Sequence, residues 1–288
     1  MQTGKFSSYL SLIKFSHTVF ALPFALIGFL AGAKAVNFNF DWWIIIPVLL
    51  CMIFARSAAM AFNRYADRYI DAKNNRTANR EIPSGIIKPN AALGFTIFNC
   101  VAFVFTTWFI NDICFYLSPV ALLVVLAYSY SKRFTALSHI ILGLGLSLAP
   151  IGAYLAVTGK FDLLPILFSI AVISWVSGFD IIYALQDEYF DREHKLFSIP
   201  SVFGTVKSLR ISELLHLFSV LVLLAASFYG NYGWLYFSGW AIFTALLIYQ
   251  HTLVKPNDLS RVNLAFFTTN GIASLVLAAF TTADMLIF

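Results

Sequence analysis

The hydrophobic runs of this chain limit its fold more than any other feature. Residues 91–110, 113–130, 134–159 and 262–283 contain no Asp, Glu, Lys or Arg. Each run is close to the roughly 20 residues with which a helix crosses a bilayer. The chain of 288 residues is only 11% charged, which leaves too few charges to cover a soluble domain. Unbroken runs predict membrane-spanning helices, because barrel strands alternate apolar and polar residues over about ten positions.

Nine such helices account for the whole chain. We therefore predict an all-α, polytopic membrane protein with a single domain over residues 1–288. The most N-terminal apolar run, within the predicted span 10–33, is interpreted as a retained span rather than a signal peptide, since no small-residue cleavage site follows it. The predicted spans are 10–33, 42–70, 90–110, 113–130, 136–158, 163–186, 207–229, 232–253 and 262–284.

The basic residues predict how these spans are oriented. All but three of the 19 Lys and Arg residues lie at the ends and loops of one side; the exceptions are Lys34, Lys160 and the intramembrane Arg56. Loops rich in Lys and Arg stay in the cytoplasm. We expect a multi-pass protein of the inner membrane with a cytoplasmic N-terminus and an external C-terminus. The net charge of +5 follows from this asymmetry, so it does not indicate a nucleic-acid partner.

Two carboxylates stand side by side at the end of the second span. The sequence NRYADRYID places Asn63, Asp67 and Asp71 four residues apart, so a continuous helix presents them on one face. Like charges at this spacing repel each other. An apolar segment that keeps such a pair at its edge points to a bound cation.

A second acidic stripe ends the sixth span. In DIIYALQDEYFD, a continuous helix would place four residues on one stripe, namely Asp180, Tyr183, Asp187 and Asp191. Asp180 lies inside the span, where a carboxylate is costly unless it faces a polar cavity and has partners. The stripe therefore predicts a polar site at the cytoplasmic end of this helix.

The two stripes are equally spaced along the chain. Asp67 and Asp187 are separated by 120 residues (187 − 67), and so are Asp71 and Asp191 (191 − 71). This spacing suggests the duplication of a four-helix unit, with spans one to four matching spans five to eight and a ninth span added.

The acidic stripes predict a divalent cation, because repulsion between carboxylates becomes attraction once a cation lies between them. Carboxylate and amide oxygens suit Mg²⁺, which keeps several waters and takes further ligands from phosphates. Zn²⁺ prefers His and Cys. The five His and three Cys of this chain are scattered without metal-ligand spacing. We therefore expect Mg²⁺, and neither zinc nor a disulfide framework.

Basic and aromatic residues lie close to both stripes. The loop after the first stripe carries Arg76 and Arg80, and the fourth span ends near Tyr128 and Lys132. Cytoplasmic topology alone accounts for an excess of basic residues. Mg²⁺ together with Arg and Lys is also the combination with which proteins hold a diphosphate. Neither a G-x-G-x-x-G fingerprint after a strand nor a Walker motif occurs, so we expect the diphosphate of a lipid.

Four segments carry a family resemblance. They are NRYADRYIDAKNNRTANREIPSG, DIIYALQDEYFD, IKFSHTVFALPFALIG and YSYSKRFTALSHIILG. The first two resemble the paired aspartate signatures of the UbiA superfamily of intramembrane prenyltransferases, and the other two match the pattern of that family. The resemblance implies nine helices around a central cavity that opens to the cytoplasmic side and laterally to lipid. It also implies transfer of a polyprenyl group from its diphosphate to an aromatic ring.

The resemblance also assigns roles by position. It implies that Mg²⁺ and the diphosphate are held by Asn63 and the catalytic carboxylates Asp67, Asp71, Asp187 and Asp191. Contacts with the diphosphate are expected from Arg76, Tyr128 and Lys132. Further candidates for binding the substrate are Arg80, Asp180 and Tyr183. Tyr128 and Tyr183 are also our candidates for stabilising an allylic carbocation, which must be kept from water.

Arg56 is the residue that gives a prediction about the chemistry of the prenyl acceptor. It precedes Asn63 by two helical turns, roughly 10 Å deeper in the second span. An arginine at this depth is costly unless it meets an anion. The carboxylate of 4-hydroxybenzoate, in ubiquinone biosynthesis, would serve, and so would that of a dihydroxynaphthoate in menaquinone biosynthesis. A structural ion pair between Arg56 and a deep acid such as Asp180 is the other interpretation.

A function from another class is a cation-coupled membrane transporter. Transporters place their sites near the midplane, between spans that are broken by Gly or Pro. Most acids of this chain instead lie at cytoplasmic helix ends beside basic loops, which favours phosphate chemistry.

Overall fold

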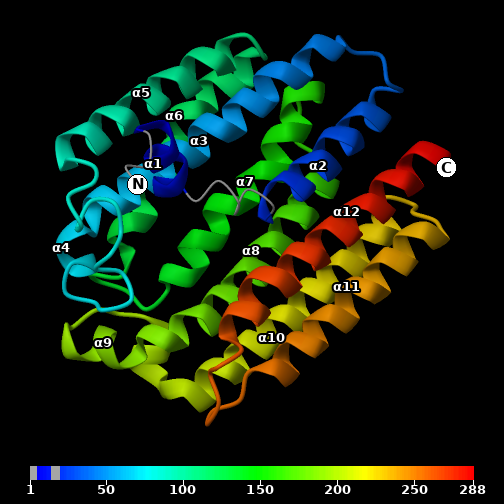
Figure 1. Ribbon diagram of the computed structural model, residues 1–288. Coiled ribbons are helices and arrows are strands. Elements are labelled where there is room, and N and C mark those ends of the chain that lie inside the picture. The colour runs from blue at the N-terminus through cyan, green and yellow to red at the C-terminus, as the bar shows by residue number, and fades with distance from the viewer. Residues whose placement is uncertain (1–4, 14–19) are drawn as a thin grey trace. The chain divides into compact units, whose positions relative to one another are not determined.

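The structure is a computed structural model that describes residues 5–13 and 20–288 (Figure 1). These residues are helical apart from turns, loops and one isolated β-bridge, and no β-strand occurs among them. The predicted all-α fold is therefore confirmed. The chain divides into two compact units. Unit 1 contains the described part of Met1–Thr18 together with Trp42–Tyr130, and unit 2 contains that of Val19–Asp41 together with Ser131–Phe288.

Unit 1 is a small group of helices. Its elements are α1 (Lys5–Leu12), η2 (Trp42–Ile44), α3 (Ile45–Ala66), α4 (Arg68–Asp71), α5 (Pro89–Trp108) and α6 (Asp112–Ser131). α3 packs against α5. A core at one end of this pair contains Leu12 of α1, Ala61 of α3, Ala92 of α5, and Ile82 and Ile87 from the loop between α4 and α5. This core fixes the loop that follows the first acidic stripe.

Unit 2 is a larger bundle arranged around one buried helix. Its elements are α2 (Leu22–Ala35), α7 (Ser138–Thr158), α8 (Leu163–Ala184), η3 (Leu185–Asp187), α9 (Glu188–Glu193), α10 (Ile199–Tyr229), α11 (Trp234–Leu253), the π-helix η4 (Leu264–Thr269) and α12 (Asn270–Ile287). α8 packs against both α7 and α10. A helix that is apolar on all sides is buried, and α8 carries one charged residue, Asp180. Fully buried Trp175 of α8 donates its indole N–H to Asn270 Oδ1 at 3.0 Å, so this polar group is satisfied within the core.

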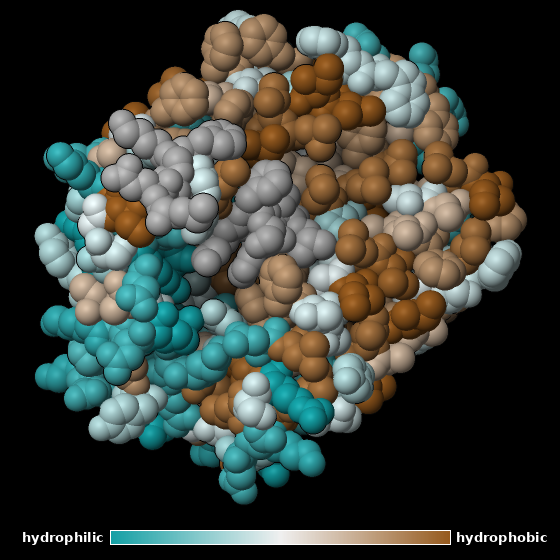
Figure 2. Space-filling view, in the orientation of Figure 1, coloured by the Kyte–Doolittle hydropathy of each residue, from teal (hydrophilic) through white to brown (hydrophobic). Residues whose placement is uncertain are grey.

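The outer surface of unit 2 is apolar along its helices. In Figure 2 hydrophobic side chains cover the exposed side of α12, and hydrophilic ones gather at the loop 254–261. Exposed Ile272 and Leu275 belong to this apolar surface. Such a pattern is expected where hydrocarbon replaces water around the helices.

Glycines allow the helices of unit 2 to approach one another closely. A Cβ at Gly28 of α2 would lie 2.0 Å from the carbonyl oxygen of Pro150 in α7. A Cβ at Gly178 of α8 would lie 2.3 Å from the imidazole of His216 in α10. Small residues at such crossings are typical of membrane helices, whose association depends on van der Waals contact.

The structure refines several predicted spans. The first was expected over 10–33; α1 ends at Leu12, α2 begins at Leu22, and residues 14–19 lie outside the described residues. The segment between the predicted spans 163–186 and 207–229 is partly helical, because it contains α9 and the start of α10. Among the described residues, seven helices are long and apolar enough to cross a membrane. They are 42–66, 89–108, 112–131, 138–158, 163–193, 199–229 and 264–287; the apolar α2 is shorter, and the count of nine stays a prediction.

The contact of Gly28 with α7 can be tested by Gly28→Ala. We expect overpacking to lower the free energy of unfolding by about 1–3 kcal/mol, because Pro150 is backbone and cannot rotate away. Thermal unfolding in detergent measures the effect. Gly94→Ala in α5 is the matched control, since its Cβ would meet no atom within 4 Å and alanine favours a helix. Equal stability of the two variants would contradict the packing argument.

Candidate active site

The first acidic motif lies where α3 ends in unit 1. Asp67 leaves the helical conformation, with φ −92° and ψ 4°, and α4 follows it. The amide of Asn63 donates to Asp67 Oδ2 at 3.0 Å, so these two side chains meet as the four-residue spacing predicts. The N–H of Asp71 donates to the carbonyl of Asp67 at 2.8 Å, so helical hydrogen bonding resumes directly after the break.

Asp71 is held by the loop that follows it. Its carboxylate is buried, and Oδ1 accepts a hydrogen bond from Arg80 Nη1 at 2.7 Å. The hydroxyl of Thr77 donates to the carbonyl of Asp71 at 3.0 Å, which folds the loop back. Asp71 Oδ2 is buried without a hydrogen-bond partner. Arg80, a predicted substrate-binding residue, therefore lies beside a predicted metal ligand.

The second acidic motif follows α8 in unit 2. Asp187 also leaves the helical conformation, with φ −105° and ψ 3°, and α9 begins after it. Asp191 is 2% exposed, and its Oδ2 lies 3.5 Å from Lys132 Nζ, too far for a hydrogen bond. The carbonyl of Lys132 accepts from the N–H of Phe197 at 2.7 Å, which holds the backbone of this lysine close to α9.

The two motifs share a local geometry that the sequence does not predict. A continuous helix was expected through each stripe, but Asp67 and Asp187 both adopt a conformation near the bridge region of backbone angles. Residues at functional sites are often found in this region. Each break separates a long apolar helix from a short polar one, α4 or α9. The second stripe is therefore not the single continuous helix face that was predicted.

The donor set fits Mg²⁺. Asp71 and Asp191 each bury a carboxylate oxygen without a hydrogen bond, which is costly unless a further cation is present. Within the described residues, no group of three or more His, Cys, Asp or Glu side chains converges on one point. Two carboxylates per motif suit Mg²⁺, because it keeps waters and takes phosphate oxygens as further ligands.

Asp180 has a partner that the sequence does not reveal. Its Oδ2 lies 2.6 Å from Nδ1 of His139 in α7. The N–H of Ile199 donates to His139 Nε2 at 3.3 Å, so a neutral imidazole carries its proton on Nδ1 and donates it to Asp180. His139 is completely buried. No local signal points to this pair, since the two residues lie 41 positions apart.

The structure places the other predicted residues as follows. Tyr183 lies against Phe266 of the π-helix, with ring centroids 4.2 Å apart. Arg56 lies within α3, two turns before Asn63, and is partly buried. Arg76 is exposed in the loop after α4, and Tyr128 is partly buried near the end of α6.

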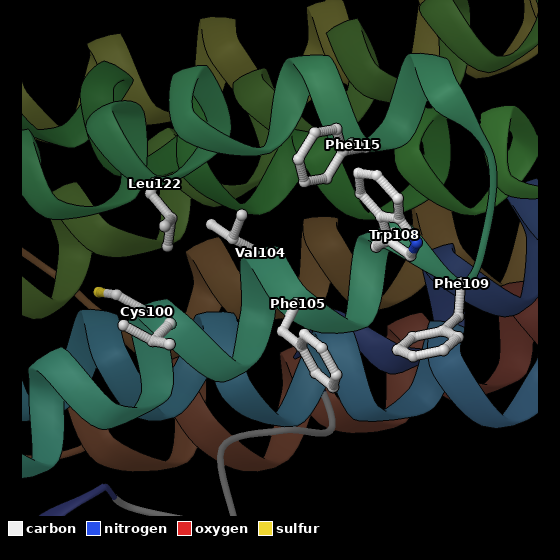
Figure 3. Close-up of a pocket in the computed structure, with 8 residues that line it drawn as sticks. Cys100, Val104, Phe105, Trp108, Phe109, Phe115 and Leu122 are labelled. Atoms are coloured by element: carbon white, nitrogen blue, oxygen red, sulfur yellow. The ribbon is translucent and has the colours of Figure 1, made fainter.

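A separate cavity in unit 1 is apolar. It has a volume of about 640 Å³ and lies between α5 and α6, lined by residues that include Val104, Trp108 and Phe115. Figure 3 shows the Trp108 and Phe115 rings close to each other, and their centroids are 4.9 Å apart. The lining contains neither an acid nor a base. This cavity therefore offers no charged side chain to a diphosphate.

Comparisons with known proteins identify the family. The family model described as UbiA prenyltransferase family matches residues 21–272. The chain belongs to this family. A 4-hydroxybenzoate octaprenyltransferase of Tolumonas auensis is 33% identical over 230 residues, which cover 77% of this chain and 78% of that protein. The protein is a polyprenyltransferase and a multi-pass membrane protein, and the resemblance drawn from the sequence is confirmed.

Solved structures of UbiA homologues agree with the fold. The apo structure of a homologue from Aeropyrum pernix K1 has a TM-score of 0.84 and 30% identity, and the match covers 93% of this chain and 98% of that one. A homologue from Archaeoglobus fulgidus, bound to DMAPP and Mg²⁺, has a TM-score of 0.73 and 20% identity. That match covers 98% of this chain and 100% of the other. At 20% identity, this second likeness supports the fold alone.

The His139–Asp180 pair can be tested by its effect on stability. His139→Phe leaves a carboxylate and the N–H of Ile199 without their partner, and we expect a loss of about 1–3 kcal/mol in the free energy of unfolding. Thermal unfolding in detergent measures it. The double variant His139→Phe/Asp180→Leu should recover part of the loss, because the charge is removed as well.

The control for this pair is His194→Phe at the end of α9, a partly buried histidine near the carbonyl of Phe190. It should leave stability nearly unchanged. If His139→Phe were as stable as this control, the hydrogen bond to Asp180 would not contribute.

Proposed function

We propose that this enzyme transfers a polyprenyl group from polyprenyl diphosphate to the ring of an aromatic carboxylic acid, with Mg²⁺ as its cofactor. The observation that carries the proposal is the paired acidic motifs. Each buries a carboxylate with one unsatisfied oxygen beside a basic residue, Arg80 in unit 1 and Lys132 in unit 2. Support also comes from the Tolumonas relative, named for 4-hydroxybenzoate. The Archaeoglobus homologue, whose fold this chain shares, is bound to DMAPP and Mg²⁺.

The acidic residues hold the metal in this mechanism. Bound Mg²⁺ neutralises the charge that develops on the departing diphosphate. In unit 1 the residues that would hold it are Asn63, Asp67 and Asp71, and in unit 2 they would be Asp187 and Asp191. The hydrogen bond from Asn63 keeps Asp67 in place. Arg80 and Lys132 orient Asp71 and Asp191, and both cations are positioned to attract phosphate oxygens as well.

The chemical step exchanges one bond for another. The C–O bond between the allylic carbon and the diphosphate breaks, and its electron pair leaves with the diphosphate. A ring carbon of the acceptor then attacks the allylic cation, and the ring loses a proton. Arg76 and Tyr128 contact the diphosphate in this proposal, and the rings of Tyr128 and Tyr183 stabilise the cation. Apolar surroundings keep water from competing with the acceptor.

Arg56 binds the carboxylate of the acceptor in this proposal. The name of the Tolumonas relative favours 4-hydroxybenzoate and ubiquinone biosynthesis. A dihydroxynaphthoate of menaquinone biosynthesis carries the same group, so Arg56 does not separate the two acceptors. The partner of Asp180 is His139 of α7, which accounts for this partly buried acid. The comparisons give no support to a transporter.

The Lys and Arg distribution supports an active site on the cytoplasmic side of the inner membrane. The N-terminus would lie on that side, and the C-terminus would be external after nine spans. In this arrangement the diphosphate leaves into the cytoplasm, and the prenylated acid remains in the bilayer.

The metal role can be tested with Asp71→Asn and Asp191→Asn. Each change keeps the side-chain volume and removes a negative charge, so we expect kcat/KM to fall at least about a hundredfold while the protein stays folded. Release of pyrophosphate from a prenyl diphosphate in the presence of 4-hydroxybenzoate measures turnover. EDTA should abolish turnover, and added Mg²⁺ should restore it.

The control for the metal test is Glu193→Gln, an exposed acid at the end of α9. It should retain full activity. Normal turnover of either aspartate variant, or of metal-free membranes, would exclude the Mg²⁺–diphosphate mechanism.

The acceptor role of Arg56 predicts a selective defect. Arg56→Ala removes a charge-assisted pair that contributes on the order of 2–4 kcal/mol. We expect kcat/KM for the aromatic acid to fall roughly 30- to 1000-fold, while KM for the prenyl diphosphate changes little. An analogue without the carboxylate, 4-hydroxybenzamide, should lose far less. A panel of benzoate and naphthoate acids measured with the wild-type enzyme identifies the preferred acceptor.

A structural role for Arg56 predicts a different outcome. General instability with equal damage to both substrates would support an ion pair within the fold. A stable variant with unchanged kinetics for the aromatic acid would refute the carboxylate role.

A further inference from the structure

Glu188 is an acid of the second motif to which the proposed mechanism gives no role. It follows Asp187 directly and begins α9. Its Oε2 accepts a hydrogen bond from the hydroxyl of Thr205 at 2.5 Å, and its Oε1 lies 3.0 Å from Arg192 Nη2. Both carboxylate oxygens are therefore occupied by protein groups. In this respect Glu188 differs from Asp191, which keeps a buried oxygen without a hydrogen bond.

The partners of Glu188 connect α9 with the start of α10. Arg192 Nε donates to the carbonyl of Ser201 at 2.8 Å, and Thr205 lies just beyond that turn. We call these four residues (Glu188, Arg192, Ser201 and Thr205) the α9 clamp. It consists of two contacts between α9 and α10: Arg192 bonds Ser201, and Glu188 bonds Thr205, four residues further along α10.

Between these two positions α10 is kinked at Gly204. This residue has φ 78° and ψ 165°, in a region that only glycine adopts without strain. Ser198 and Ser201 form a capping box that starts the first turn of α10 independently of the rest of the helix. The kink therefore lies between Ser201 and Thr205, and α9 contacts α10 on both sides of it.

α9 needs such external contacts. It has six residues, and an isolated helix of this length is unstable in water. Tyr189 on the same helix is 82% exposed and contributes little packing. The N–H of Leu196 donates to the carbonyl of Asp191 at 2.8 Å and closes the end of the helix. The α9 clamp ties the beginning and the last turn of α9 to α10.

We propose that the α9 clamp positions Asp187 and Asp191 for the metal, and that Glu188 is a positioning residue rather than a ligand. This inference rests on the proposed function. A charge-assisted hydrogen bond such as that from Thr205 is short and strong, so it restricts the rotation of α9 more than a neutral one. Fixed ligand direction matters for Mg²⁺, which demands near-octahedral geometry.

Thr205→Val is the sharpest test, because valine has the shape of threonine and every charge near the metal is kept. We expect roughly 10- to 100-fold weaker binding of Mn²⁺, used as the probe and measured by electron paramagnetic resonance without substrate. The Mg²⁺ concentration for half-maximal activity should rise by a similar factor, whereas kcat at saturating Mg²⁺ should stay close to that of the wild type. Thr205→Ser restores the hydroxyl and should restore both values.

Two further variants serve as control and as backup. Thr252→Val makes the same change at an exposed hydroxyl near the end of α11 and should behave as the wild type. Arg192→Gln changes a side chain that is 54% exposed, so the protein should fold even if Thr205→Val does not. It should weaken Mn²⁺ binding in the same direction.

The outcomes separate the two proposals. Absence of Mn²⁺ binding and of Mg²⁺-dependent turnover in the wild type would refute the proposed function, and the clamp with it. If the wild type binds Mn²⁺ but Thr205→Val and Arg192→Gln bind it equally well, only the clamp is refuted. A lower kcat with unchanged Mn²⁺ affinity would also overturn the positioning role.

Discussion

A buried carboxylate with one unsatisfied oxygen is the feature on which the proposed chemistry depends. Asp71 has it in unit 1 and Asp191 has it in unit 2. Arg80 and Lys132 offset part of the cost of burial. Arg80 bonds only Oδ1 of Asp71, and Lys132 lies 3.5 Å from Asp191 Oδ2, so one buried oxygen of each carboxylate has no hydrogen bond. A site of this kind suits a divalent cation that takes further ligands from phosphate oxygens, as the proposed function requires.

An aspartate within an apolar helix needs a hydrogen-bond partner from the protein, and Asp180 of α8 is the example in unit 2. Asp180 is only partly exposed within the apolar helix α8, where a carboxylate is costly without a partner, so a fixed hydrogen-bond donor stabilises it. His139 supplies it, and the N–H of Ile199 at the start of α10 sets the tautomer that can donate. This contact joins α7, α8 and α10 at one point. Ile199 is the first residue of α10, so this contact also holds the start of that helix against α7 and α8.

The features of this molecule that depend on residues close together in the chain can be predicted from the sequence. Run length predicts the helices, and the four-residue spacing predicts that Asn63 meets Asp67. Contacts between residues far apart in the chain cannot be predicted in this way. His139 and Asp180 are 41 residues apart, and Glu188 and Thr205 are 17 apart. The breaks at the aspartates are missed for a related reason, because local propensity favours a continuous helix and tertiary contacts override it.

Three carboxylates of the second motif illustrate how partners, rather than residue type, decide function. Asp187, Glu188 and Asp191 lie within five consecutive positions and carry the same charge. Glu188 has a hydroxyl and a guanidinium on its two oxygens, so its charge is used to hold α9. Asp191 has a lysine at a distance and an oxygen that remains unsatisfied. A count of acids in this motif therefore says little about how many of them could bind a metal, because the oxygens of Glu188 and Asp191 have different contacts.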